Sequence, residues 1–197
     1  MKGNAEDQYL LACCYEHGTE GVKRDKVAAA AWWGKAAAQE HAGAQYDLGA
    51  CYEDGDGVEQ DYQVAVMFYR KAADAGHAVG LGVLGGCYAL GKGVEQNDAL
   101  AVMWWEKGVV SGHAGSQYML GFCYMHSQRG LPKNARRARS HYDAIKYLKL
   151  LKACESCGAP DANRTCGAFG FSCRRCATAA SQSKILTRFP AITRTKS

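Results

Sequence analysis

Apolar and small side chains recur along most of the chain at the spacing of one helix face. Within residues 42–53, Gln45, Leu48, Gly49 and Tyr52 lie three or four positions apart or side by side. Side chains at this spacing project from the same side of a helix. The pattern therefore predicts a helix over 42–53 with one apolar or small face.

The same spacing predicts a second helix over 62–75. Between the two helices lies Gly55-Asp56-Gly57, and glycine readily adopts the positive φ that ends a helix and turns the chain. Asp61 directly precedes the second helix, where its carboxylate can accept hydrogen bonds from free backbone N–H groups. The segment is thus predicted to be a helix–turn–helix unit.

This unit occurs four times. The dipeptide Cys-Tyr marks it at residues 14–15, 51–52, 87–88 and 123–124, at intervals of 37, 36 and 36 residues. The copies span about 5–41, 42–77, 78–113 and 114–153. No copy could bury its apolar face alone, so the copies must stack on one another. We therefore predict an all-α fold, an α/α solenoid of about four helix–turn–helix repeats over residues 1–153.

An aromatic ring also recurs in each second helix, at Trp33, Tyr69, Trp105 and Tyr142. We expect small residues such as Gly49 to let the helices approach closely, and the ring to fill the gap between neighbouring copies. Two of these rings belong to the pairs Trp32-Trp33 and Trp104-Trp105. We expect one tryptophan of each pair in the core and the other partly exposed.

The second copy carries the motif on which a family resemblance rests. Its residues are Ala42-x-x-Gln45-Tyr46-x-Leu48-Gly49-x-Cys51-Tyr52, then Gly55-x-Gly57-Val58-x-x-Asp61 and Ala65-x-x-Phe68-Tyr69-x-Lys71-Ala72-Ala73-x-x-Gly76-His77. This motif resembles the Sel1-like repeat, a relative of the tetratricopeptide repeat, and the resemblance covers about 5–150. It implies an α/α superhelix that binds proteins as an adaptor or scaffold. Residues 2–5 resemble the end of a preceding copy whose second helix is missing, and this resemblance leaves open whether the chain is a fragment of a longer repeat protein.

One cysteine recurs in each copy, at Cys14, Cys51, Cys87 and Cys123. We expect these side chains to act as small buried hydrophobes. Packed helices lie about 8–10 Å apart, whereas a disulfide needs Cα atoms within about 7 Å, so equivalent cysteines of successive copies should not pair. Free cysteines favour a reducing compartment. The N-terminus also lacks the apolar core of a secretory signal, so we expect a protein of the cytoplasm, with the nucleus as alternative, that is not secreted.

Two further classes of partner are disfavoured within the repeats. The longest apolar run, residues 27–33, is seven residues long, whereas a membrane span needs about twenty. His41, His77 and His113 recur at the junctions between copies, but stacked copies hold them too far apart to share one metal ion. We therefore expect no membrane partner, and we interpret the three histidines as turn residues.

Four cysteines near the C-terminus have the spacing of metal ligands. Cys154-x-x-Cys157 and Cys173-x-x-Cys176 are separated by fifteen residues, with Cys166 between them. Two such pairs suit tetrahedral zinc, because each pair holds one side of the ion while the intervening loop folds back. The candidate metal ligands are therefore Cys154, Cys157, Cys173 and Cys176, within a Cys-rich segment at 154–176.

This segment is similar to the start of a MYND-type zinc finger, on Cys154-Glu155-Ser156-Cys157-Gly158-Ala159-Pro160 and Cys173-Arg174-Arg175-Cys176. The full finger interleaves two zinc ions and typically binds short proline-containing peptides. Its later ligands, including a His-x-x-x-Cys, are absent here beyond Cys176. Two interpretations stay open: the four cysteines regroup around one zinc ion, or the finger is incomplete and binds none. Residues 177–197 are rich in Ser, Thr, Lys and Arg and are predicted to form a disordered basic tail.

The N-terminal and C-terminal parts of the chain carry opposite net charges. Residues 1–128 carry 9 Lys and Arg against 16 Asp and Glu, a net charge of −7, whereas residues 129–197 carry 15 against 3, a net charge of +12. The basic part is typical of a region that binds nucleic acid or another acidic partner. In its cluster Arg136-Arg137-Ala138-Arg139, no aromatic platform alternates with the charges. We therefore interpret the cluster as the polar outer face of the last copy, and nucleic acid as the less favoured partner.

The function that best fits these patterns is a non-catalytic adaptor or scaffold. A protein or peptide would bind in the groove of the solenoid, the C-terminal cysteines could hold one zinc ion, and no catalytic or organic-cofactor residues are assigned. One alternative comes from the resemblance, because cysteine-rich secreted members of the family are linked to β-lactam hydrolysis. They carry two cysteines per copy, however, and this chain carries one. The other alternative is a nucleic-acid or acidic-partner binder that acts through the basic C-terminal part.

Overall fold

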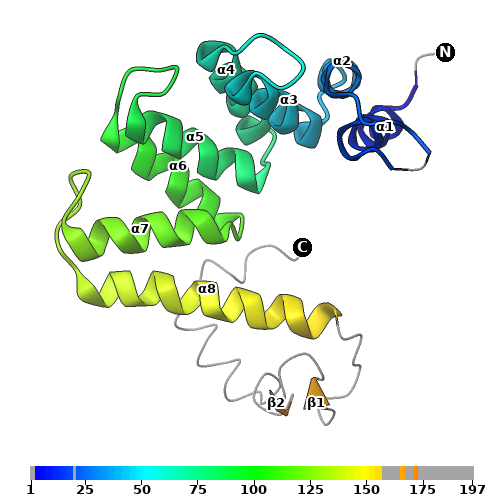
Figure 1. The fold of residues 1–197 in the computed structure, drawn as a ribbon. Coiled ribbons are helices and arrows are strands. Elements are labelled where there is room, and N and C mark those ends of the chain that lie inside the picture. The colour runs from blue at the N-terminus through cyan, green and yellow to red at the C-terminus, as the bar shows by residue number, and fades with distance from the viewer. Residues whose placement is uncertain (1–2, 20, 157–164, 167–170, 173–197) are drawn as a thin grey trace. The chain divides into compact units, whose positions relative to one another are not determined.

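The computed structural model describes residues 3–19, 21–156, 165–166 and 171–172, with side-chain surroundings through residue 146. Its described part contains four antiparallel helix pairs (Figure 1). Their bounds are α1 Ala5–His17, α2 Lys26–Ala37, α3 Ala42–Asp54, α4 Tyr62–Asp74, α5 Ala78–Leu90, α6 Asp98–Val110, α7 Ala114–His126 and α8 Ala135–Ser156. The predicted all-α helical repeat is confirmed, and helices α3 and α4 match their predicted ranges to within one residue.

Two short strands were not predicted. Strand β1, Thr165–Cys166, pairs antiparallel with β2, Phe171–Ser172. Helix α8 also continues to Ser156, three residues beyond the predicted end of the fourth copy. No described helix is both long enough and apolar enough to cross a bilayer.

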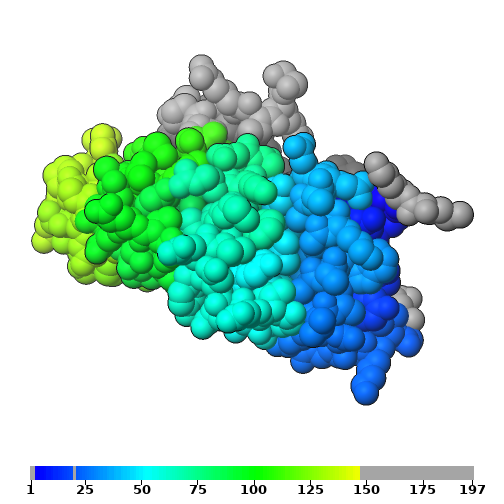
Figure 2. Space-filling view, turned by 90° about the horizontal axis from the view of Figure 1, so that it is seen from above, coloured from blue at the N-terminus to red at the C-terminus, as the bar shows by residue number. Residues whose placement is uncertain are grey.

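The chain forms two compact units. The first, residues 1–113, contains copies one to three, and the second, residues 114–197, begins with α7 and α8. In the first unit each helix packs against the next along the chain, so that α2 contacts α3 and α4 contacts α5. Figure 2 shows its three copies as successive blue, cyan and green bands. In the second unit, α7 packs against α8.

The backbone carbonyls of the recurring Cys-Tyr dipeptide hold the turn within each copy. In the second copy, the Cys51 carbonyl accepts from the N–H of Gly55 at 2.8 Å, and Gly55 has a φ of 74°. The Tyr52 carbonyl accepts from the N–H of Asp61 at 2.9 Å, and the Asp61 carboxylate then caps α4 by accepting from Gln63. The same two carbonyl contacts recur in copies one and three, whereas in copy four the Cys123 carbonyl accepts from Gln128 and the Tyr124 carbonyl from Asn134. Asp25, Asn97 and Asn134 also cap their helices.

The recurring aromatic ring packs inside its own copy. A Cβ built on Gly49 would lie 2.8 Å from the Tyr69 ring, and one built on Gly85 would lie 2.5 Å from the Trp105 ring. Trp105 also donates from Nε1 to the Gly82 carbonyl of its own copy at 3.1 Å. The prediction that small residues permit close approach is correct. The space left by each glycine lies within the copy, and Trp33 also belongs to a core cluster with Ala44, Leu48 and Cys51 of the next copy.

Neighbouring copies of the first unit meet where a glycine turn touches the start of the preceding second helix. A side chain at Gly57 would overlap the Lys26 carbonyl, and Asp56 beside it forms an ion pair with Lys26 at 2.5 Å. At the next junction, Lys92 contacts Glu53 at 2.6 Å and lies 4.5 Å from the centre of the Tyr62 ring. A side chain at Gly93 would likewise overlap the Tyr62 carbonyl. The two junctions therefore share this backbone contact, but an aspartate lies beside it in one and a lysine in the other.

The repeat cysteines behave largely as predicted. Cys51, Cys87 and Cys123 are buried, Cys14 is partly buried, and all four are free thiols. Burial raises the pKa of Cys51 to about 12 and that of Cys87 to about 11. Both thiols therefore stay protonated near neutral pH and serve as apolar packing groups.

We predict that Gly85→Ala destabilises the protein, because its new methyl group would meet the rigid Trp105 ring. Overpacking of this kind typically costs about 1–3 kcal/mol. Gly86→Ala is the matched control, since no atom lies within 4 Å of its built Cβ, and alanine favours a helix over glycine by about 1 kcal/mol. Urea denaturation of both variants would measure the difference. Equal stability of the two variants would contradict the packing argument.

Candidate functional site

A pair formed by an aromatic ring and a lysine repeats on the second helices of the first unit. The lysine follows the ring by three residues, which places both side chains on the same side of the helix. The pairs are Trp32–Lys35, Phe68–Lys71 and Trp104–Lys107, with the lysine Nζ 3.5, 5.4 and 4.1 Å from the ring centre. Sequence analysis missed this series, although its constant spacing is visible in the sequence.

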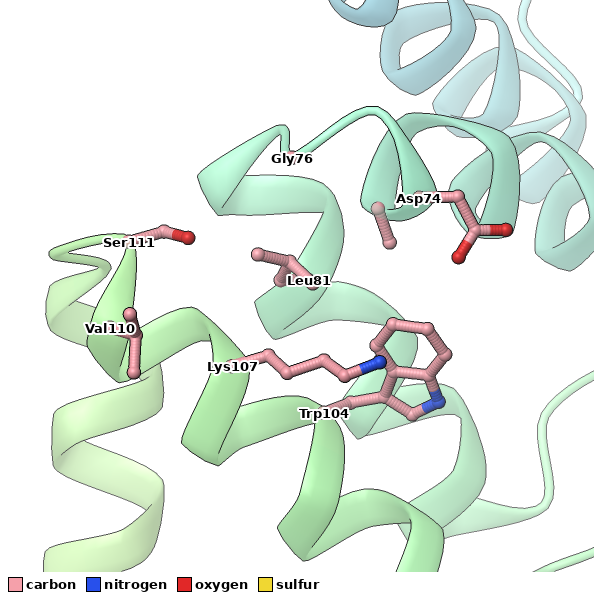
Figure 3. Close-up of a pocket in the computed structure, with 8 residues that line it drawn as sticks. Asp74, Gly76, Leu81, Trp104, Lys107, Val110 and Ser111 are labelled. Atoms are coloured by element: carbon pink, nitrogen blue, oxygen red, sulfur yellow. The ribbon is translucent and has the colours of Figure 1, made fainter.

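The third pair borders a cavity of about 370 Å³ between α4, α5 and α6. Its lining is formed by Ala73, Asp74, Gly76, Leu81, Trp104, Lys107, Val110 and Ser111. Figure 3 shows the Lys107 side chain extending along the Trp104 ring, with Val110 and Ser111 at the end of α6. We call this space the Trp104 cavity; its floor is apolar and its rim carries charged and hydroxyl groups.

The structure corrects one expectation about the tryptophans. Trp33 and Trp105 are in the core and Trp32 is partly exposed, as predicted. Trp104, however, is only 5% exposed, and its Nε1 has no hydrogen-bond partner among the described residues. The ring therefore serves as a wall of the cavity, and the exposed Lys107 ammonium group covers part of its face.

The junction histidines are turn residues, as predicted, and two of them have a further role that sequence analysis missed. His41 accepts at Nδ1 from the N–H of Ala44 at 3.0 Å, and His77 accepts from Gly80 at 3.2 Å, so both cap the first helix of the next copy. The Tyr46 ring lies 5.1 Å from the His77 ring. Among the described residues, no group of three or more His, Cys, Asp or Glu could hold a metal ion.

The arginine cluster of α8 is divided by the fold. Arg137 donates to the Tyr124 hydroxyl at 3.1 Å, and its guanidinium carbon lies 5.4 Å from the centre of that ring. Arg136 and Arg139 instead line a second cavity of about 700 Å³ in the second unit. One arginine of the cluster thus holds α8 against α7, while two face open space.

The candidate zinc ligands are only partly covered by the structure. Cys154 lies in the last turn of α8. Cys157, Cys173 and Cys176 lie outside the described residues, as does the predicted basic tail at 177–197. Whether the four cysteines come together therefore stays a prediction.

The antiparallel helix pairs define an all-α helical-repeat protein. More narrowly, the chain belongs to the Sel1 repeat family, whose model matches residues 5–41, 42–77, 80–109 and 114–149. Proteins of this family are typically protein-interaction scaffolds. A comparison with curated protein sequences finds no match.

Two solved structures support the same fold. A protective antigen from uropathogenic Escherichia coli strains, which displays an SLR fold, has a TM-score of 0.69 and 28% identity over 97% of this chain. A Sel1 repeat protein from Oxalobacter formigenes has a TM-score of 0.69 and 26% identity over 98% of this chain. This chain covers 38% of the first protein and 72% of the second.

We predict that mild acid destabilises the chain partly through His77. Burial lowers the pKa of His77, while Asp47 opposes this shift and His41 adds to it. Below about pH 6.5 the unfolded state therefore binds more protons than the folded state, so the free energy of unfolding falls as the pH drops. His77→Asn keeps a capping side chain without this titration. Urea denaturation at pH 7.5 and 5.5 should show a smaller loss in the variant, and an equal loss would contradict the assignment.

Proposed function

We propose that this chain is a non-catalytic scaffold that binds a protein or peptide segment on its repeats. The Trp104 cavity is the observation that carries this proposal. Its apolar floor can receive an aliphatic or aromatic side chain, because Leu81, Trp104 and Val110 border it. Asp74, Lys107 and Ser111 at the rim can hydrogen bond to the backbone or polar groups of the same segment.

The position of this cavity fits a repeat protein. It lies where copies two and three meet, so its walls come from α4, α5 and α6 together. A segment that binds there would contact two copies at once, and the aromatic–lysine pairs on α2 and α4 provide similar groups at the preceding copies. This arrangement supports binding of an extended segment along the second helices.

Peptide selection on the purified chain tests this proposal. Peptides chosen by phage display should bind the chain in fluorescence polarisation, and Val110→Asp should weaken them at least tenfold by placing a charge at the apolar rim. Val27→Asp is the matched control, because Val27 is also exposed and does not line the cavity. Both variants should keep the wild-type circular dichroism.

Two outcomes would contradict the scaffold proposal. Peptides that bind Val110→Asp as tightly as the wild type would show that the Trp104 cavity is not the binding site. Turnover of nitrocefin by the purified chain above background would show an enzyme of β-lactamase type instead.

We further propose that Cys154, Cys157, Cys173 and Cys176 hold one zinc ion. Four thiolates form a tetrahedral ligand set that suits zinc. Two observations support a closed site. Cys154 lies in the last turn of α8, and the antiparallel pairing of β1 with β2 reverses the chain direction between the two cysteine pairs. When bound, the ion would tie the segment together.

Elemental analysis of reduced, purified protein tests the zinc proposal. The wild type should contain about one equivalent of zinc, and the double variant Cys173→Ser/Cys176→Ser should contain none. Cys166→Ser should keep its zinc, because Cys166 is outside the proposed ligand set. A wild-type protein without zinc would show that the finger is incomplete.

We also propose that the chain works in a reducing compartment, the cytoplasm or the nucleus. The free thiols of Cys13, Cys14, Cys51, Cys87 and Cys123 support this location. A disulfide between any two of them, mapped by mass spectrometry in protein alkylated at lysis, would argue against it.

A further inference from the structure

We propose that the second cavity, between α7 and α8, binds an acidic peptide segment that also carries an apolar side chain. We call it the arginine cavity; it is lined by Met125, Ala135, Arg136, Arg139, Tyr142 and Asp143. All six residues belong to the second unit, so the proposal does not depend on the Trp104 cavity.

The two arginines supply the charge of the proposed site. Arg136 and Arg139 are three residues apart on α8, so their side chains leave the same side of the helix. Both are exposed, and the structure shows no ion pair for either among the described residues. Guanidinium groups bind carboxylates through paired hydrogen bonds. Two unpaired guanidinium groups at one cavity therefore favour a segment with at least two carboxylates.

Arg137 shows the contrast within the same sequence cluster. Its guanidinium group packs on Tyr124 and donates to the hydroxyl of that residue. Arg137 is thus occupied in holding α8 against α7. The sequence presents three equivalent arginines, whereas the fold leaves two of them available for a ligand.

The apolar part of the cavity is held by a rigid ring. A Cβ built on Gly121 would lie 2.8 Å from the Tyr142 ring, so the glycine lets this ring pack directly against α7. Tyr118, which is also on α7, lies beside this ring, with the two ring centroids 5.9 Å apart. Met125 adds a flexible apolar side chain beside it. An apolar side chain of the peptide would rest on Tyr142 and Met125 while its neighbouring carboxylates meet the arginines.

Charge complementarity favours the same ligand. Residues 114–146 carry six Lys and Arg against one acidic residue, Asp143. Asp143 also lines the cavity and offsets one of the two arginine charges, which leaves a net positive lining. Among the described residues of the lining, Tyr142 is the single aromatic one, whereas single-stranded nucleic acid is usually bound on several rings in succession. A peptide therefore fits this cavity better than a nucleic acid.

Fluorescence polarisation with a labelled Glu-Glu-Leu-Phe-Glu-Glu peptide tests the proposal. The wild-type chain should bind this peptide, and Arg136→Glu/Arg139→Glu should weaken binding at least tenfold. Lys133→Glu is the matched control, since Lys133 is an exposed cation just before α8 that does not line the cavity. It should change the affinity by less than about threefold. Val110→Asp, which tests the Trp104 cavity, should leave this binding unchanged.

Three results would overturn the proposal. Lys133→Glu could weaken binding as much as the double variant, which would show a diffuse charge effect. A labelled Glu-Glu-Ser-Ser-Glu-Glu peptide, which has the same charge, could bind as tightly as the mixed peptide, which would show that the Tyr142 floor is not used. A 20-nucleotide single-stranded DNA could bind more tightly than the peptide and displace it, which would identify a nucleic-acid surface. Circular dichroism of each variant would confirm that the helices are retained.

Discussion

The contact between a glycine and an aromatic ring sets the geometry of copies two, three and four. Where the first helix has no side chain, at Gly49, Gly85 and Gly121, the ring of the second helix lies against its backbone. The first copy uses the fully buried Ala12 at the equivalent position. Because a ring cannot bend, this contact fixes the distance between the two helices of a copy. It also fixes which side of the second helix faces outward, and so where its lysines and arginines lie.

Both proposed binding cavities follow from this arrangement. In the third copy, Trp105 occupies the core position, so its neighbour Trp104 is turned towards the Trp104 cavity. In the fourth copy, Tyr142 lies against Gly121 and also borders the arginine cavity. The residues that hold each copy together thus belong to the same short stretches of sequence as the residues that line the surface. The two cavities differ in charge, because Asp74 and Lys107 balance at the Trp104 cavity, whereas two arginines outnumber Asp143 at the arginine cavity.

The alignment of the four copies predicted the helices, their caps and the free cysteines, because these features depend on local sequence that is repeated four times. It did not predict features that depend on neighbours in space. His41 and His77 cap helices through a ring nitrogen, and the aligned sequences alone did not predict this role. Trp104 looked like an exposed partner of Trp105 but is buried, and the arginines of α8 looked equivalent but have different surroundings. In each case a contact with another helix or turn, rather than the local pattern, decides the role.

The junctions between copies carry information about their order. Asp56 of the second copy meets Lys26 of the first, whereas the equivalent residue of the third copy is Lys92, which meets Glu53 and Tyr62 of the second. If the third copy directly followed the first, its lysine would meet Lys26 in place of the Tyr62 ring, while Glu16 would stand where Glu53 does. A repulsive contact would thus replace the contact with the ring, although an acidic partner would remain. The copies share one backbone contact but differ in the side chains around it, so their order along the chain affects the electrostatics of each junction.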